Sequence, residues 1–283
     1  MEDLGFGAIG TANPIFRGPS VSRDGSFISG TADTFGGFRF EVGGSYVPLP
    51  NSAQIGDMTP DGQFIGGASR DSGSFPNRAV RYRGANNYTV EYINPFPTAT
   101  YQAVRGVSDD GRAMSLHVEE NGFGSTYLLR DNQPPVLVHS LPFSQSTNGA
   151  IGFDISADGS RIIGSTWQWT IQSRFESVGN RINPITIAPD GNTVLGTFGG
   201  RAKLLRNDGI AVDVQNLLAT EYGINFGAWR LREIVGMSDD GNVWAGNGIN
   251  PQGFTEGWMV VIPEPASALT CTIALLAITR RRR

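Results

Sequence analysis

The chain has 283 residues, with 22 basic and 26 acidic side chains, a net charge of −4 at pH 7 and a single cysteine. This balance argues against a nucleic-acid-binding protein, which would carry a basic stripe, and the lone Cys271 leaves no disulfide within the chain. The 38 glycines and 16 prolines are typical of short strands separated by tight turns and argue against an all-helical fold.

The first ten residues, MEDLGFGAIG, carry two acidic residues, no basic residue and no long apolar stretch. A secretory signal peptide begins with basic residues followed by an apolar run, so this segment does not fit one. Because residues 1–5 are similar to the end of an internal repeat segment, we expect the native protein to have further residues upstream, including a signal peptide.

One ten-residue pattern occurs six times along the chain. It consists of an apolar residue, Ser or Thr in most copies, any residue, Asp-Gly, two variable residues, an apolar residue, a variable residue and usually Gly. The copies are residues 21–30, 58–67, 107–116, 155–164, 187–196 and 237–246, and their shared aspartates are Asp24, Asp61, Asp110, Asp158, Asp190 and Asp240.

Asp-Gly between apolar residues predicts the tight turn of a β-hairpin. Glycine accepts a positive φ, and the aspartate side chain accepts hydrogen bonds from nearby backbone N–H groups. The Ser or Thr two residues earlier adds a hydroxyl to this network. The pairs Asp109-Asp110 and Asp239-Asp240 raise calcium binding as an alternative, but a calcium loop needs several spaced oxygen ligands. We therefore assign the six aspartates a structural role, with no metal.

A second, looser segment lies between the copies, as in residues 37–50, 125–142 and 200–218. Each of these reads as a strand with an aromatic or basic centre, a polar turn, and a second strand ending in Leu-Pro or Leu-Leu. Two hairpins per unit make four strands in about 32 to 50 residues, the size of one β-propeller blade. The sequence predicts an all-β fold over residues 1–262, a six-bladed propeller with seven blades as the alternative. The short interval from Asp158 to Asp190 predicts a reduced blade.

The alternation of a Ser-x-Asp-Gly hairpin, as in residues 155–164, with a strand pair resembles HAF-type extracellular repeats. It is more distantly similar to Asp-box and Tol-type propeller blades. The last unit, residues 246–263, also resembles the final repeat of the HAF family. The resemblance implies a propeller fold in an extracellular protein, and its short motifs carry no activity.

Trp167 and Trp169 alternate along a predicted strand, so both rings face the same side. Two open interpretations follow: the rings stack on a sugar ligand, or they pack between neighbouring blades. Trp229, Trp244 and Trp258 are predicted to belong to the blade core.

Catalytic signals are weak. His117 and His139 occupy strand-like positions with no cysteine nearby, which argues against zinc, and we expect both to be partly exposed. No nucleophile elbow or phosphate loop occurs, so no cofactor is predicted. The enzyme alternative is a propeller glycosidase or lyase with paired carboxylates. Its candidates are Glu91, Glu119, Glu120, Glu176, Glu221 and Glu233, although no two of them are paired by the sequence.

The chain ends in a Pro-Glu-Pro, fourteen uncharged residues and four arginines. These are Pro263, Glu264 and Pro265, the stretch 266–279, and Arg280, Arg281, Arg282 and Arg283. Fourteen helical residues rise about 21 Å, against a hydrocarbon core of about 30 Å, so we expect a short transmembrane helix that is marginal as a permanent anchor. The arginines stay on the cytoplasmic side, which predicts an N-out, C-in orientation.

These three ordered features resemble the PEP-CTERM sorting signal of Gram-negative bacteria. The resemblance implies an exosortase-type enzyme as a partner that recognises and cleaves the tail at residues 263–283, and an exopolysaccharide or biofilm setting. We therefore expect an exported, non-enzymatic β-propeller that serves as a binding or structural module of the cell envelope or extracellular matrix. The alternative is an extracellular polysaccharide-acting glycosidase or lyase on the same scaffold.

Overall fold

The computed structural model describes residues 16–22, 26–32, 36–41, 44, 46–69, 78–84, 88–145, 151–188, 190–238 and 241–262. Within these ranges the chain forms six antiparallel sheets in which strands that follow one another in sequence pair with each other. Each sheet is one blade, numbered here 1 to 6 in chain order. The prediction of an all-β, six-bladed propeller is confirmed.

Five blades have four strands, and blade 6 has three in the described part of the chain. Blades 1 to 3 consist of β1 (Phe16–Val21), β2 (Phe27–Ala32), β3 (Gly36–Glu41) and β4 (Tyr46–Pro48); β5 (Ser52–Met58), β6 (Phe64–Ser69), β7 (Arg78–Arg83) and β8 (Thr89–Ile93); and β9 (Tyr101–Val107), β10 (Ala113–Glu120), β11 (Phe123–Arg130) and β12 (Val136–Pro142). Blades 4 to 6 consist of β13 (Gly152–Ile155), β14 (Arg161–Gly164), β15 (Trp167–Thr170) and β16 (Arg174–Ser177); β17 (Asn183–Ile187), β18 (Val194–Phe198), β19 (Arg201–Leu205) and β20 (Ala211–Asp213); and β21 (Arg230–Met237), β22 (Val243–Ile249) and β23 (Thr255–Val261). A 3₁₀ turn (Phe143–Gln145) follows β12.

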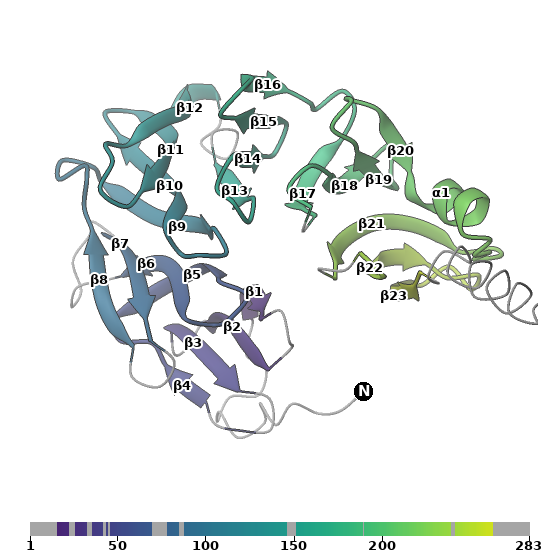
Figure 1. Cartoon of the computed structure of the whole chain (residues 1–283), viewed down its shortest axis with the longest axis horizontal. Coiled ribbons are helices and arrows are strands. Elements are labelled where there is room, and N and C mark those ends of the chain that lie inside the picture. Colours follow the sequence, from purple (N-terminus) through teal and green to yellow (C-terminus); the bar gives the residue numbers. More distant parts are fainter. Residues whose placement is uncertain are drawn as a thin grey trace, which may run out of the picture.

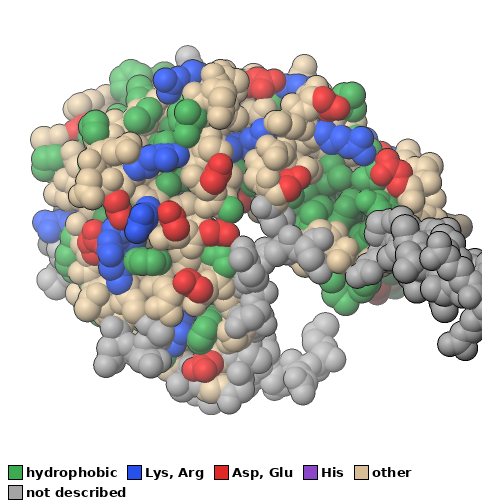
Figure 2. Space-filling model, in the orientation of Figure 1, with side chains coloured by type: hydrophobic (Ala, Val, Ile, Leu, Met, Phe, Trp, Pro, Cys, Tyr) green, Lys and Arg blue, Asp and Glu red, His purple; other side chains and the backbone are tan. Residues whose placement is uncertain are grey.

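The blades follow one another around an arc, with blade 1 at one end and blade 6 at the other (Figure 1). The first strand of each blade contacts the first strand of the next, from β5 to β9, β13, β17 and β21. Hydrophobic side chains gather at the end of the arc formed by blade 6 (Figure 2). On β23 the side chains of Met259 and Val261 are 70% and 63% exposed.

The repeated Asp-Gly turn joins the first two strands of a blade. In blade 3 the Asp110 carboxylate accepts the backbone N–H of Arg112 at 3.0 Å and the Ser108 hydroxyl at 2.8 Å. Gly111 has φ +69°, and a Cβ atom at this position would lie 2.4 Å from the Phe64 ring of blade 2. Glycine is therefore needed both for the turn and for the close packing of neighbouring blades.

The expectation of a reduced blade between Asp158 and Asp190 needs correction. Blade 4 keeps all four strands, and each is shortened to four residues. A four-residue strand still spans about 13 Å, so a short sequence interval holds a complete blade.

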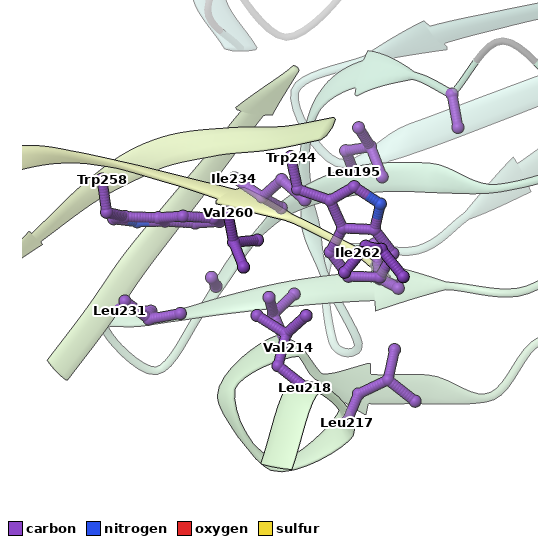
Figure 3. Packing of buried hydrophobic residues seen from close by; sticks show 13 residues of the cluster. Leu195, Val214, Leu217, Leu218, Leu231, Ile234, Trp244, Trp258, Val260 and Ile262 are labelled. Atoms are coloured by element: carbon purple, nitrogen blue, oxygen red, sulfur yellow. The ribbon is translucent and has the colours of Figure 1, made fainter. Parts of the chain in front are cut away.

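Residues 200–218 also differ from the expected strand pair. After β20 the chain forms the helix α1 (Val214–Glu221), which begins where the Asp213 carboxylate accepts the N–H of Asn216 at 3.1 Å. Val214, Leu217 and Leu218 then share one helical face and are buried. They pack with Trp244 and Trp258 of blade 6 in one hydrophobic cluster (Figure 3). The helix thus covers the contact between blades 5 and 6.

Helix α1 has eight residues, and no helix in the described ranges is long and apolar enough to cross a membrane. The predicted apolar helix of the tail, residues 266–279, lies outside the residues that the structure describes.

Candidate functional site

A series of depressions runs across the contacts between neighbouring blades, and two of the three reach the edge of the propeller at which the Asp-Gly turns lie. In an antiparallel blade the turn between strands one and two and the turn between strands three and four lie at the same end. A pocket of about 280 Å³ lies where blade 2 meets blade 3, and one of about 450 Å³ where blade 3 meets blade 4. They share Arg130 and residues 131–133, and the second pocket shares Asp158 with a cavity of about 470 Å³ between blades 4 and 5. We call the three together the rim groove.

The contact between blades 2 and 3 centres on Arg81, which is 2% exposed. Its guanidinium donates to Glu91 at 3.0 and 3.1 Å and to Asp131 at 3.0 Å, and it also donates to the carbonyl of Gly111. Burial opposes the charge, but Glu91 and Asp131 outweigh it and raise the pKa of Arg81. The pKa of Glu91 is lowered in turn, because bonds from Arg81 and Arg83 outweigh burial. Every guanidinium nitrogen of Arg81 is hydrogen-bonded, so we call this the closed contact, although the pocket of about 280 Å³ lies beside the network.

The contact between blades 4 and 5 is arranged differently. Arg161, 6% exposed, donates to the carbonyl of Asn192 at 2.6 Å and to the side-chain oxygen of Asn207 at 2.7 Å. Burial lowers the pKa of Arg161. On the same side, the Gln168 amide donates to Glu176 at 2.7 Å. Ion pairing with Arg181, together with the bond from Gln168, lowers the pKa of Glu176. The 4–5 cavity lies beside these groups.

Strand β15 separates an apolar side from this polar one. Trp167 and Trp169 are 1% and 2% exposed and pack with Leu128 and Val138 of blade 3. Gln168 and Thr170, which alternate with the tryptophans, line the 4–5 cavity. The burial of both indoles is that of the packing interpretation, and Trp169 also borders a pocket of about 230 Å³ together with Ile171 and Arg174.

The predicted turn aspartates Asp61, Asp110, Asp158 and Asp190 each accept the N–H two residues ahead, at 2.8 to 3.0 Å. Asp110 and Asp158 also line the rim groove. Asp24 and Asp240 lie outside the described residues, as do Pro263, Glu264, Pro265 and Arg280, Arg281, Arg282 and Arg283.

The six candidate glutamates are not brought together, and each has a different partner. Glu91 binds Arg81 and Arg83, Glu119 contacts His117, Glu120 accepts from Thr98, Glu176 binds Arg181, Glu221 contacts Arg206, and Glu233 accepts from Asn247.

The expectation that both histidines are partly exposed is wrong for His117, which is 1% exposed. Burial lowers its pKa to about 4, and the nearby Arg105 charge adds to this effect. His139 is half-buried between Trp167 and Phe175, with ring centroids 5.2 and 4.5 Å away, and burial lowers its pKa too. In the described part of the chain no group of three or more His, Cys, Asp or Glu side chains could hold a metal ion.

Two aspartates that the sequence analysis missed join neighbouring blades near the centre of the propeller. Asp57 accepts the N–H of Val107 at 3.0 Å, linking β5 to β9. Asp154 accepts the N–H of Ile187 at 2.9 Å and the hydroxyl of Thr186 at 2.7 Å, and burial raises its pKa. Both aspartates directly precede the apolar residue that opens a repeat copy. That shared position is the signal that could have identified them.

No family model and no curated protein matches this chain. Among solved structures, a TolB-type protein from Agrobacterium tumefaciens is similar, with a TM-score of 0.50 and 14% sequence identity, covering 89% of this chain and 91% of its own. The β-propeller domain of Cps50 (Swd1) from Myceliophteria thermophila has a TM-score of 0.52 and 8% identity, covering 87% of this chain and 83% of its own. At these identities the likeness shows the β-propeller fold.

Proposed function

We propose that this protein is an exported, non-enzymatic β-propeller that serves as a binding or structural module of the cell envelope or extracellular matrix. An exosortase-type enzyme recognises its C-terminal tail and removes it after transfer across the inner membrane. The rim groove is the binding surface. The observation that carries the binding function is the groove itself, three pockets across blades 2 to 5 that are linked by shared lining residues.

The tail supports the export part of the proposal. Pro263 and Pro265 disfavour helical structure at the start of the tail, so an apolar helix over residues 266–279 cannot be lengthened toward β23. The arginines at 280–283 resist transfer across the membrane. The apolar stretch between them is short for a permanent anchor. This order suits a segment that is held briefly in the membrane and then cut.

The glycosidase or lyase alternative is favoured by one observation. Three carboxylates, those of Asp110, Asp131 and Asp158, line the 3–4 pocket together with Arg112 and Arg130. A glycosidase needs one carboxyl group with a raised pKa to act as the acid.

Neither turn aspartate of this pocket meets that need. Burial acts to raise the pKa of Asp110 and Asp158, but hydrogen bonds from Ser108 and the Arg112 N–H to Asp110, and from Ser156 and Ser160 to Asp158, outweigh it and lower both. Asp131 is held in an ion pair with Arg81. The pocket therefore supports binding better than acid catalysis.

Mass spectrometry of the native protein tests the delivery. We expect the mature protein in the envelope or medium fraction, ending near Pro265 and lacking the four arginines. A variant with Arg280, Arg281, Arg282 and Arg283 changed to Gln keeps the apolar stretch but should alter sorting or processing. Recovery of the intact tail on wild-type protein in the cytoplasm would overturn the proposal.

A further inference from the structure

The 4–5 cavity has an unusual lining. Its volume is about 470 Å³, within the usual range of about 300 to 1,000 Å³ for ligand sites. Every residue of the lining is polar or glycine: Asp158, Ser160, Arg161, Gln168, Thr170, Gln172, Ser173, Glu176, Gly191, Asn192 and Asn207. Ligand pockets are ordinarily lined mainly by apolar and aromatic groups, so this cavity is suited to a ligand with little apolar surface.

The position of Gln168 explains why the lining is polar. Gln168 pairs across the sheet with Ile163, and Arg81 pairs with Gly66, which occupies the same place in the repeat pattern. In blades 3 and 5 this position holds Leu128 and Leu204, both buried. Blade 4 therefore replaces a buried leucine, or an arginine with its ion pairs, by an amide.

The charges in the lining are already engaged. Arg161 donates to Asn192 and Asn207, and Glu176 is paired with Arg181. One oxygen of Asp158 accepts from the Ser156 hydroxyl and the Ser160 N–H, at 2.7 and 2.9 Å. Arg161 is the only cation of the lining, and the Arg181 guanidinium beside it is paired with Glu176, so an anion such as a phosphate would meet two ionised carboxylates and no uncommitted cation. An apolar ligand would find no apolar side chain to bury.

The uncharged groups of the lining are amides and hydroxyls, some of which bond one another or the backbone, as the Thr170 and Ser173 hydroxyls do at 2.6 Å. Gln172, Ser173 and Asn192 are exposed, and an amide or hydroxyl both donates and accepts hydrogen bonds. The Oε1 atom of Gln168 is buried and has no hydrogen-bond partner in the described part of the chain. A set of groups that can donate and accept at many points matches a molecule whose surface is mostly hydroxyl groups.

We propose that the 4–5 cavity binds a neutral polyhydroxylated ligand, one or two sugar units of a polysaccharide. This inference rests on the proposed binding function and deepens it by naming the ligand class. The cavity shares Asp158 with the 3–4 pocket, so further units of the same polysaccharide extend along the rim groove.

Isothermal titration of the full chain tests the proposal, with neutral tetrasaccharides of glucose, of mannose and of galactose as probes. A uronic-acid tetrasaccharide and inorganic phosphate serve as anionic probes. The variant Asn192→Trp fills the cavity from an exposed turn. Gln63→Trp is its matched control, because Gln63 has the same turn position in blade 2 and does not line the cavity.

We expect wild type and Gln63→Trp to bind at least one neutral probe equally, and Asn192→Trp to bind it at least tenfold more weakly. Circular dichroism verifies that each variant is folded. If Asn192→Trp does not fold, Gln172→Ala replaces it. Gln172 is an exposed turn residue of the lining whose side chain makes no hydrogen bond within the described part of the chain, and its truncation should weaken binding at least threefold.

Failure of every neutral probe, preference for an anionic probe, or unchanged binding by Asn192→Trp or its replacement would each overturn the inference. Tail processing is measured separately by mass spectrometry. A processed, envelope-located protein that binds no neutral sugar would therefore refute the ligand class while leaving the delivery intact.

Discussion

The 2–3 and 4–5 blade contacts use the same position of the repeat in opposite ways. At the 2–3 contact Arg81 joins two carboxylates and the carbonyl of Gly111. At the 4–5 contact the Gln168 side chain makes one hydrogen bond, to Glu176, and the cavity there is about 470 Å³, against about 280 Å³ for the pocket at the 2–3 contact. The repeat fixes where a side chain points. The choice of that side chain decides whether its polar atoms are all bonded, as at the closed 2–3 contact, or partly unpaired, as at the open 4–5 contact.

Blade 4 can leave the 4–5 contact open because the opposite side of β15 supplies stability to the blade. The Trp side of β15 is buried against blade 3, with both indoles at 2% exposure or less. Burial of apolar surface contributes roughly 25 cal/mol per Å² to stability. A side-chain amide that exchanges a hydrogen bond with water for one with the protein contributes only about 1 kcal/mol net. One strand thus anchors the blade on one side and leaves the other side available for binding.

The largest expected effect comes from the anchoring side. Trp167→Ala should lower the free energy of unfolding by about 3 to 5 kcal/mol, because it leaves a cavity in a packed cluster. Gln168→Ala, one residue along on the opposite side, should cost at most about 1 kcal/mol. Urea denaturation followed by circular dichroism measures both. Equal losses would show that the two sides of β15 do not differ as described.

The next effect concerns the closed contact. Arg81→Ala should cost about 3 kcal/mol, because it leaves Glu91 and Asp131 without their shared cation. The figure is at the low end for a buried charge pair, since both carboxylates are partly exposed. Arg83→Ala is the control: Arg83 also binds Glu91 but is 43% exposed, so its loss should cost at most about 1 kcal/mol. A larger loss for Arg83 would contradict this account.

Acid should weaken the closed contact through His117. The centroid of the His117 ring lies 5.9 Å from that of the Tyr101 ring. The Tyr101 hydroxyl donates to the side-chain oxygen of Gln54 in blade 2 at 2.9 Å. Burial lowers the pKa of His117 to about 4, below the value of about 6.5 in the unfolded chain. The unfolded state therefore binds more protons between these values, and stability is complete above pH 6.5 and lost as the pH falls toward 4.

Between pH 7 and pH 5 the loss from this residue should be about 2 kcal/mol. His117→Gln carries no titrating group at this position, so its stability should vary less over the same range. Urea denaturation at several pH values measures the slope. His139→Gln is the control, because the half-buried His139 should contribute a smaller slope. A wild-type slope retained in full by His117→Gln would refute the assignment.

The hairpin turns were predictable from the sequence because their interactions are local. Asp110 bonds with residues two positions away, and six repeats of the same pattern sufficed to predict the blades. Helix α1 was missed because Val214, Leu217 and Leu218 follow β20 directly, and their apolar character fits a strand as well as a short helix. Here tertiary packing against blade 6 decides the structure.

The rim groove could not be predicted in the same way. Arg161 reaches Asn207, 46 residues further along the chain, and the Arg81 bond to Asp131 spans 50 residues. Such contacts depend on how one blade is placed against the next. The burial of His117 and the links made by Asp57 and Asp154 have the same origin, since the neighbouring blade supplies part of each environment.

The smallest expected effect tests whether the turns themselves differ between a closed and an open contact. In blade 3 the Ser108 hydroxyl accepts the N–H of Ala113 at 2.9 Å and donates to Asp110. In blade 5 Ala188 stands in this place, and Asp190 itself accepts the equivalent N–H, that of Thr193, at 2.8 Å.

Ser108→Ala should therefore cost about 1 kcal/mol, because a buried N–H loses its acceptor. Ala188→Ser should change stability by at most about 0.5 kcal/mol, since Asp190 already satisfies the N–H of Thr193 and also accepts its hydroxyl at 2.8 Å. Urea denaturation of the two variants gives the difference. A large gain from Ala188→Ser would mean that the blade 5 turn is under-bonded and that the open 4–5 contact reflects a weak turn. A change in the free energy of unfolding close to zero would show that the two contacts differ because of Arg81 and Gln168.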